Sequence, residues 1–515
     1  MPKTAITGTL VSLAIDKTSS VPIYRQMADL LREAVSAGRI SAGSKLPSTR
    51  IFAEELGVSR NTVLQVFDTL INEGFLISRV GAGTYVSGET SERDEPGQLP
   101  TESSNPGESH YPFRSLSRRG KSIVSSATDA FTESPTPFMP DLPDLREFPI
   151  RTWLRLLNET SGRLRGEVLA DTSNAGYEPL RRAIAQYLNA SRGMSCDFTQ
   201  VIITTGSQQS LDLVSRMLLD PGDPVWLEEP GYIGARAAFS ANGAALYPAA
   251  VDENGLCFDL AATTLPSPRL IFASSSRHYP LGATLSAERR LALIDFADRS
   301  GAWIIEDDYD HEFRYSGTTP ISIHGLDHGN RTIHLGTFSK ILLPSLRLGY
   351  MVVPHDLIDS FAKARAVVDR HASLIEQMVL SEFLHRGLLV SHVRRMRTLY
   401  RTRQKQLIDG LTELFGESIP FASVETGMHV LLPLTNDADD QKIANLCVAQ
   451  KLVLRPLSPY YLGHRRRQGL LFGFSAFNTE EVAQGIARLS AFQSDIAPFV
   501  PLLNYQYGPP KLVRN

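Results

Sequence analysis

The sequence predicts a multidomain protein, in which a small winged helix-turn-helix module precedes a large α/β domain. The stretch from Gly88 to His110 divides the two parts, because Leu99 is its only large apolar residue and Pro, Gly, Ser and Glu dominate it. Before this stretch, apolar residues recur at helical spacing between helix-capping residues. After it, continuous apolar runs alternate with amphipathic segments, as in parallel strands covered by helices.

Three helices are expected in the first module. The first carries the apolar stripe Ile23, Met27, Leu30, Leu31, Ala34 and Val35. The second runs from about Ser48, its capping residue, to Leu56, and Gly57 stops it. Ser59 caps the third helix, which ends at Gly74. Two short helices joined by a three-residue turn form a helix-turn-helix.

The segment Phe75–Val86 is expected to form two strands around Gly81 and Gly83, which makes a β-wing. The polar face of the third helix carries residue types that bind base edges or phosphates in the major groove: Arg60, Asn61, Thr62 and Gln65. Residues expected to contact the DNA backbone are Arg50, Arg79, Thr84 and Tyr85. A solvated amphipathic helix is the alternative for the third helix, and the wing favours the DNA-binding interpretation.

The motifs of this module resemble the GntR-type winged helix along essentially its whole length. They are Leu46-Pro-Ser-Thr-Arg50, Leu56-Gly-Val-Ser-Arg-Asn-Thr-Val63 and Gly81-Ala-Gly-Thr-Tyr-Val86. Residues 1–88 contain nine Lys or Arg and seven Asp or Glu, which is compatible with nucleic-acid contact. The resemblance implies binding to a double-stranded DNA operator.

The expected boundaries follow from these patterns. Residues 1–88 form the DNA-binding domain, 89–125 a flexible linker, 126–496 the large domain and 497–515 a tail. The linker cannot bury enough apolar surface to offset the entropy of ordering it.

In the large domain, five continuous apolar runs are expected to be strands buried on both faces: 201–204, 224–228, 269–273, 303–306 and 332–335. Residues 287–300 form one of the intervening helices. Ligands of such a sheet bind beyond the carboxyl ends of the strands. Gly206, Ser207 and Gln208 follow the first strand and open a helix, where backbone N–H groups could hold a phosphate; the alternative is an ordinary turn.

Lys340 lies in an apolar setting, between Phe338 and the run Ile341-Leu-Leu343, seven residues before Arg347. Most lysines are solvated at the surface. A desolvated lysine near another cation has a lowered pKa and becomes a nucleophile toward aldehydes. Lys340 is therefore the candidate for a Schiff base with a pyridoxal cofactor, and Arg347 for its phosphate.

The acidic run 306–312 follows the strand at 303–306. Three interpretations are open: a divalent-metal site, caps on the following helix, or a carboxylate against a protonated pyridine nitrogen. We favour the third, with Asp307 at the ring nitrogen and Tyr309 at the ring hydroxyl, and expect no metal.

Taken in order, these elements resemble fold-type I aminotransferases, and the whole chain resembles the MocR group of bacterial regulators. The resemblance implies pyridoxal 5′-phosphate as cofactor, a smaller α+β subdomain, and Tyr232 stacked on the cofactor ring. It also implies a head-to-tail homodimer that senses a small amine or amino acid.

The chain departs from the family in several places. The usual SHQYPTG is replaced by Ser276-Arg-His-Tyr-Pro-Leu-Gly282, which changes charge near the cofactor. The usual YGDPxGY is replaced by Asp171-Thr-Ser-Asn-Ala-Gly-Tyr177, which lacks a tyrosine often lent to the partner's phosphate site. No arginine for a substrate carboxylate stands near Gly473; Arg465, Arg466 and Arg467 lie upstream, and Arg236 is a weaker candidate.

We expect a pyridoxal-phosphate-dependent transcription regulator. The alternative is an active aminotransferase with an appended DNA-binding module. A residual transaminase-type half-reaction would also be compatible with a regulator. A regulator that senses pyridoxal phosphate itself is a third hypothesis. No run approaches 18 apolar residues and no secretory signal is visible, so we expect a cytoplasmic protein. Cys196, Cys257 and Cys447 lie too far apart in sequence for a CxxC pair.

Overall fold

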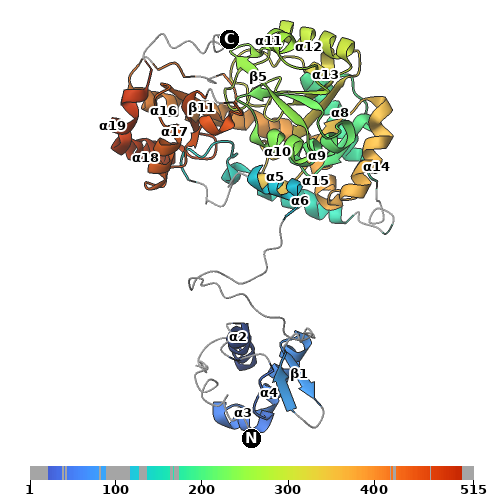
Figure 1. The fold of residues 1–515 in the computed structure, drawn as a ribbon, viewed down its shortest axis with the longest axis vertical. Helices are drawn as coiled ribbons and strands as arrows, with labels where there is room; N and C mark the ends of the chain where they lie inside the picture. The colour runs from blue at the N-terminus through green and yellow to red at the C-terminus, as the bar shows by residue number, and fades with distance from the viewer. Residues whose placement is uncertain are drawn as a thin grey trace, which may run out of the picture. The chain divides into compact units, whose positions relative to one another are not determined.

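The computed structural model describes residues 21–36, 40, 43–79, 83–87, 116–126, 136–162, 166, 173–417, 419–421, 425–463 and 466–501. The chain divides into two compact units, Met1–Pro112 and Phe113–Asn515 (Figure 1). Among the described helices, none combines the length and apolar character that crossing a bilayer would require.

The first unit contains the three expected helices, α2 (Ile23–Ser36), α3 (Thr49–Leu56) and α4 (Arg60–Asn72). Ser48 and Ser59 cap α3 and α4, because their hydroxyls accept from the backbone N–H groups of Ile51 and Thr62. Gly57 ends α3 in the left-handed conformation, with φ of 61°. The apolar stripes meet in one core that includes Met27, Phe52, Val63 and Val66, all fully buried.

The wing is an antiparallel hairpin of β1 (Leu76–Arg79) and β2 (Gly83–Val86). Leu46 donates its backbone N–H to the carbonyl of Thr84 at 2.9 Å, which ties the wing to the segment before α3. The winged helix-turn-helix is therefore confirmed as the fold of this unit.

The second unit is built on an eight-stranded sheet of order β3-β10-β9-β8-β7-β4-β5-β6. Its strands are β3 (Val201–Thr204), β4 (Pro224–Glu229), β5 (Ala245–Asp252), β6 (Gly255–Leu256), β7 (Leu270–Ala273), β8 (Trp303–Asp307), β9 (Thr332–Thr337) and β10 (Gly349–Val352). The five expected strands are present. β10 runs antiparallel between β3 and β9, and the pairs from β9 through β5 are parallel.

Helices cover both faces of the sheet. One face packs against α9 (Ser207–Leu218), α10 (Ile233–Ala241) and α14 (Ile358–Val368). The other packs against α6 (Ile150–Ser161), α8 (Glu178–Arg192), α11 (Phe258–Thr264), α12 (Ala287–Ser300), α13 (Ile323–Leu326) and α15 (Leu374–His385). Strand residues alternate between the two cores; in β8, for example, Ile304 faces one core and Ile305 the other.

A smaller α+β subdomain follows in the chain. Its three-stranded sheet, of order β11-β13-β12, contains β11 (His429–Leu434), β12 (Arg455–Pro456) and β13 (Gln468–Gly473). Its helices are α16 (Leu388–Phe415), α17 (Asp440–Val448), α18 (Thr479–Leu489) and α19 (Gln493–Ile496). Their apolar faces form a separate core around Tyr400, Leu407 and Phe472.

Two expected boundaries differ from the structure. The predicted linker 89–125 includes most of helix α5 (Arg118–Ser126), which packs beside α10, with Arg119 donating to Asn242 at 2.7 Å. Packing on α10 stabilises a segment whose polar composition alone predicted no structure.

The predicted tail 497–515 begins with an ordered turn, because Phe499 and Val500 pack on the subdomain core. Residues 502–515 lie outside the described residues.

Candidate functional site

The candidate residues lie where β8, β9 and β3 end. Asp307 is the last residue of β8, Gly206 and Ser207 follow β3, and Lys340 follows β9 by three residues. β8 and β9 are parallel neighbours, so their carboxyl ends meet at one edge of the sheet. The topology thus collects residues separated by more than 130 positions in the chain.

At the end of β8, successive side chains of the acidic run point to opposite faces of the sheet. Glu306 lies 3.0 Å from Nδ1 of His334 and accepts from the backbone N–H groups of Ile323 and His324, so this residue does cap the start of α13. Asp308 forms a fully buried ion pair with Arg192 at 2.7 Å. That ion pair holds the pKa of Asp308 well below its usual range, although burial alone would raise it.

Asp307 differs from Glu306 and Asp308, because no cation of the described residues pairs with it. Its Oδ1 atom is buried and has no hydrogen-bond partner in the structure. Burial, and then the neighbouring carboxylates of Asp308 and Glu228, raise the pKa of Asp307 to about 8. Asp307 has the same parity in β8 as Ile305, so it faces the side of the sheet that α9 and α10 cover. Among the described residues, no group of three or more His, Cys, Asp or Glu is arranged to hold a metal ion.

Lys340 points its amine into the same region. Nζ donates to the backbone carbonyl of Asp141 at 2.9 Å. Burial lowers the pKa of Lys340, and the carboxylate of Asp141 opposes this effect. The charge of this amine lowers the pKa of Asp307 and partly offsets the effect of burial, as expected for side chains at the ends of the neighbouring strands β8 and β9.

Gly206, Ser207 and Arg347 come together as expected. Gly206 adopts φ of 115° and caps α9, whose first residue is Ser207. The guanidinium of Arg347 lies beside Gly206, because a Cβ atom placed on that glycine would be 3.6 Å from Nη1. Gln208 differs from the expectation, because its side-chain amide donates to the carbonyl of Gly234 at 3.0 Å. The structure thus gives Gln208 a role in joining α9 to α10.

Tyr232 and Tyr309 belong to an aromatic cluster around Tyr279. The ring of Tyr279 lies edge-on to those of Tyr232 and Tyr309, each 6.3 Å away between centroids. Burial raises the pKa of Tyr232, and the negative charges of Asp307 and Asp141 add to this effect. Tyr232 therefore stands near both carboxylates as a neutral phenol.

Arg277, one of the departures from the family pattern, is completely buried. Its Nη1 donates to the hydroxyl of Tyr309 and to Asp310, both at 3.2 Å, and its Nη2 lies 3.0 Å from Nε2 of His429. Asp310 balances the charge of Arg277, and burial lowers the pKa of His278 to about 3, so that histidine is neutral. The expected change of charge beside the cofactor is thus cancelled within the protein.

The sequence did not single out four residues that the structure places at the site: Asp141, His429, Arg455 and Tyr460. Asp141 lies 3.1 Å from His429 and 3.8 Å from Arg455, and the hydroxyl of Tyr460 lies 3.0 Å from that of Tyr279. A usable signal was present at Arg455, which stands between apolar residues in Leu-Val-Leu-Arg-Pro-Leu, as Lys340 does in its own run.

The earlier candidates for a carboxylate clamp lie elsewhere. Arg236 donates to the backbone carbonyls of Pro459 and Tyr461, and so braces a loop. Arg466 is exposed and bonds to the carbonyl of Gly463. Arg465 and the departure at Asp171 lie outside the described residues.

In the first unit, most of the predicted DNA-binding residues are accessible to solvent. Arg50, Arg60, Asn61 and Gln65 are exposed, and Thr62 and Thr84 are half-buried. Arg60 donates to Thr49 at 3.4 Å, which joins α4 to α3. Arg79 pairs with Gly83 across the wing, and its side chain is outside the described set.

Comparison with known proteins supports both units. Residues 23–86 match the model of bacterial regulatory proteins of the gntR family, and residues 144–489 match that of aminotransferase class I and II. The chain is 37% identical over 93% of its length, and 96% of the relative, to the probable rhizopine catabolism regulatory protein MocR of Rhizobium meliloti. It is 29% identical over 91% of its length, and 96% of the relative, to the HTH-type transcriptional regulator TauR of Rhodobacter capsulatus.

The fold of the second unit is similar to solved aminotransferases. The kynurenine aminotransferase of Pyrococcus horikoshii, solved in complex with PMP, matches with a TM-score of 0.65 and 27% identity, covering 71% of this chain and 92% of that one. The multiple substrate aminotransferase of Thermococcus profundus matches with a TM-score of 0.66 and 25% identity, covering 74% and 97%.

Fold, site and matches together define a DNA-binding regulator whose second domain has the architecture of a class I and II aminotransferase, with pyridoxal 5′-phosphate as its cofactor. The chain belongs to the MocR group of bacterial transcription regulators. The prediction of a regulator is thereby confirmed over that of an enzyme with an appended reader.

Proposed function

We propose that this regulator senses a small primary amine through pyridoxal 5′-phosphate bound covalently at Lys340. The observation that carries this proposal is the pair of Asp307 and Lys340: a buried carboxylate oxygen without a partner and a desolvated amine face one site. A buried carboxylate needs a cationic partner, and a protonated pyridine nitrogen supplies one.

The residues present fit the cofactor at each of its polar groups. Asp307 would accept from the ring nitrogen, Tyr309 would bind the ring hydroxyl, and Tyr232 would stack on the ring. Gly206 and Ser207 at the start of α9 would hold the phosphate with Arg347, where backbone N–H groups, the helix dipole and a guanidinium favour an anion. Gln208 would support this loop through its bond to Gly234. When bound, the cofactor supplies an aldehyde that condenses reversibly with amines.

Lys340 would hold the cofactor through its aldehyde, and an effector amine would compete with Nζ of Lys340 for that aldehyde and so leave the lysine as a free amine. The carbonyl of Asp141, which accepts from Nζ in this structure, is ready to receive the released amine. An effector shifts the protein only through its different affinity for two arrangements. We infer that these arrangements differ in how a head-to-tail homodimer presents its two winged helices to an operator.

The buried lysine can be tested by absorbance. Replacing Lys340 with Ala should abolish a band near the visible edge in protein purified with the cofactor, because no other residue is assigned to the aldehyde. The matched control is Lys363→Ala, which removes an exposed lysine of α14 and should keep the band. An unchanged spectrum in Lys340→Ala would remove the covalent claim.

Two rival functions give different outcomes in a second assay. Operator binding is measured for protein with and without cofactor, and with and without amines. Amine sensing predicts that amines change operator affinity only when cofactor is present. A sensor of pyridoxal phosphate itself would respond to the cofactor alone, and an enzyme would release ketone product over many turnovers.

A further inference from the structure

Asp141 occupies an unusual position beside the amine of Lys340. Its backbone has φ of 66°, in the left-handed region that non-glycine residues rarely adopt. The residue is almost fully buried, at 8% exposure, although its side chain is a carboxylate. Buried carboxylates are retained when they are paired or serve a function.

The carboxylate of Asp141 is surrounded by the polar groups of the site. Oδ1 lies 3.1 Å from Nδ1 of His429, and Oδ2 lies 3.8 Å from Nη1 of Arg455. Nε2 of His429 lies 3.0 Å from Nη2 of Arg277 and 3.1 Å from the carbonyl of Pro280, so the imidazole joins Asp141 to Arg277 and to that carbonyl. Arg455 also bonds to the hydroxyl of Tyr460.

Arg277 and Arg455 are therefore each paired with a carboxylate that belongs to the protein itself. Arg277 faces Asp310 at 3.2 Å, and Arg455 faces Asp141. A carboxylate carried by a ligand would have to compete with Asp141 for Arg455 and would be repelled by it. Like charges brought together in a water-excluded site disfavour binding strongly.

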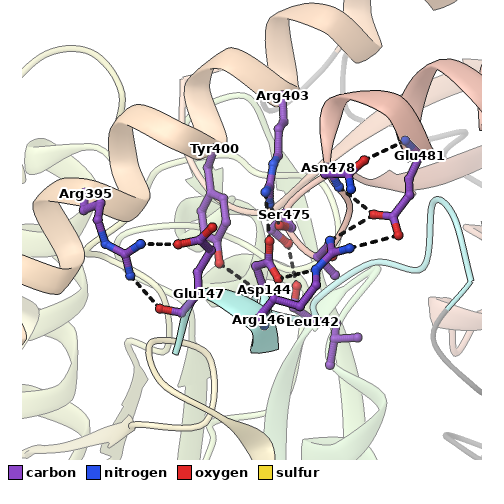
Figure 2. A network of polar contacts seen from close by, with 11 residues as sticks. Leu142, Asp144, Arg146, Glu147, Arg395, Tyr400, Arg403, Ser475, Asn478 and Glu481 are labelled. Atoms are coloured by element: carbon purple, nitrogen blue, oxygen red, sulfur yellow. Dashed lines mark hydrogen bonds and ion pairs between the residues drawn. The ribbon is translucent and has the colours of Figure 1, made fainter. Parts of the chain in front are cut away.

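The segment that carries Asp141 is firmly anchored, as Figure 2 shows for the residues that follow it. Ser475 donates to the carbonyl of Leu142 at 2.6 Å, and Tyr400 accepts from the backbone N–H of Asp144 at 3.0 Å. Arg403 forms a buried ion pair with Asp144 at 2.8 Å. Asp141 is thus held in place by α16 and the end of β13, and cannot easily swing away from an incoming ligand.

The same network reaches further along the segment. Arg146 forms an ion pair with Glu481 of α18 at 2.9 Å, and Arg395 of α16 pairs with Glu147 (Figure 2). These contacts with the smaller subdomain hold the segment that carries Asp141, so its carboxylate stays beside His429 and Arg455.

We propose that Asp141 makes the site select primary amines that lack a carboxylate. It does so by pairing with Arg455, which would otherwise bind the carboxylate of an amino acid. This inference rests on the proposed amine-sensing function. It assigns the effector to amines whose other polar groups are neutral or cationic, and it excludes amino acids. Specificity then arises from a built-in repulsive group as much as from attraction.

The test uses matched pairs of probes that differ only in the carboxylate: ethanolamine against serine, and 4-amino-1-butanol against 4-aminobutanoate. Each is titrated into the full-length protein with cofactor, and the apparent Kd is read from the shift of the cofactor absorbance band. Because like-charge repulsion in a buried site is large, we expect the amine without a carboxylate to bind at least about tenfold more tightly in each pair.

Two variants isolate the charge of Asp141. Asp141→Asn keeps the shape and tolerates the left-handed backbone, and Asp141→Gly suits that backbone without strain. Within each pair of probes, both variants should reduce the ratio of the two apparent Kd values by about tenfold, because the carboxylate of the ligand can then reach Arg455. Asp259→Asn, which removes an exposed carboxylate of α11, should leave the ratio unchanged.

Equal binding of both members of each pair by the unaltered protein, or a ratio that survives in Asp141→Asn and Asp141→Gly, would overturn the assignment of Asp141. Amine sensing would stand in that case, because amines would still shift the band. If no amine of either kind shifts a band that Lys340→Ala abolishes, the sensing function itself is wrong, and the two failures are thereby distinguished.

Discussion

At the scale of single residues, the acids around the end of β8 have different environments although they are neighbours in sequence. Glu306 pairs with His334, Asp308 with Arg192 and Asp310 with Arg277. Among these four acids Asp307 alone is paired with no cation of the described residues, and its buried Oδ1 has no hydrogen-bond partner. A structural role is therefore assigned to three of these acids, and the fourth is left for a ligand.

Replacing Asp307 with Asn should affect stability and cofactor binding in opposite ways. In cofactor-free protein, the folded-state pKa of about 8 lies above the ordinary 3.8, so the folded state holds the extra proton and stability falls as pH rises between these values. The variant cannot ionise, so its free energy of unfolding should exceed that of the unaltered protein by an amount that grows from pH 5 to about pH 8 and reaches about a few kcal/mol, and its Tm should rise accordingly.

Calorimetry of both cofactor-free proteins across this pH range measures the difference in Tm. The control is Asp298→Asn, which removes an exposed carboxylate of α12. The same Asp307→Asn variant should hold the cofactor more weakly, as equilibrium dialysis would show. A Tm difference that shrinks as pH rises would refute the assigned ionisation.

Removing Arg277 should be costly for a different reason. Arg277→Gln leaves Asp310 buried without its cation, which should destabilise the protein by about 3–5 kcal/mol. Adding Asp310→Asn should recover most of this loss, because the uncompensated charge disappears. Urea unfolding of the two single variants and the double variant measures the coupling, and strictly additive losses would show that the pair is not coupled.

At the scale of elements, the sequence predicted the strands and helices whose signals are local. The five apolar runs, the helix at 287–300 and the capping serines of α3 and α4 were all recognisable, because periodicity and capping depend on nearby residues. The antiparallel insertion of β10 between β3 and β9 was missed, because strand order depends on contacts far apart in sequence.

The candidate site divides in the same way. Lys340, Arg347 and Asp307 stood in recognisable runs, and the structure brings each to the strand ends. Asp141, His429 and Arg455 come from a loop and two strands of another sheet, so no spacing in the sequence announces that they meet Lys340. The helix α5 was missed because its stability comes from packing on α10.

The recognition helix α4 and the wing should contribute differently to DNA binding. Gln65→Ala should relax base preference at one position, costing about 1–3 kcal/mol on the operator and little on random DNA, because Gln65 is exposed on α4. Arg79→Ala should weaken binding to all sequences alike. It should also reduce the slope of the logarithm of the binding constant against the logarithm of salt concentration by about one. Binding isotherms on both DNAs at several salt concentrations separate these effects, and equal losses for Gln65→Ala on both would contradict base readout.

At the scale of the whole molecule, a compact DNA-binding unit and a larger cofactor-binding unit are joined in one chain. Neither unit alone explains regulation, because a change at Lys340 must alter operator affinity through differential binding. A homodimer would supply this link, since two winged helices on one assembly bind two half-sites together.

The dimer can be tested by light scattering coupled to size-exclusion chromatography. The full chain should elute with about twice its mass of 56.8 kDa, and operators with two half-sites should bind at least about 100-fold more tightly than single half-sites. A monomeric mass at concentrations that saturate the operator would exclude this mode of binding.

The central claim is the covalent attachment of the cofactor, and borohydride reduction tests it most directly. The purified protein with cofactor is reduced, digested and analysed by mass spectrometry. A reduced pyridoxyl group is expected on the peptide that contains Lys340 and on no other. A peptide containing Lys340 that is recovered without the adduct, from protein that retains its cofactor, would show that the cofactor is not bound covalently there.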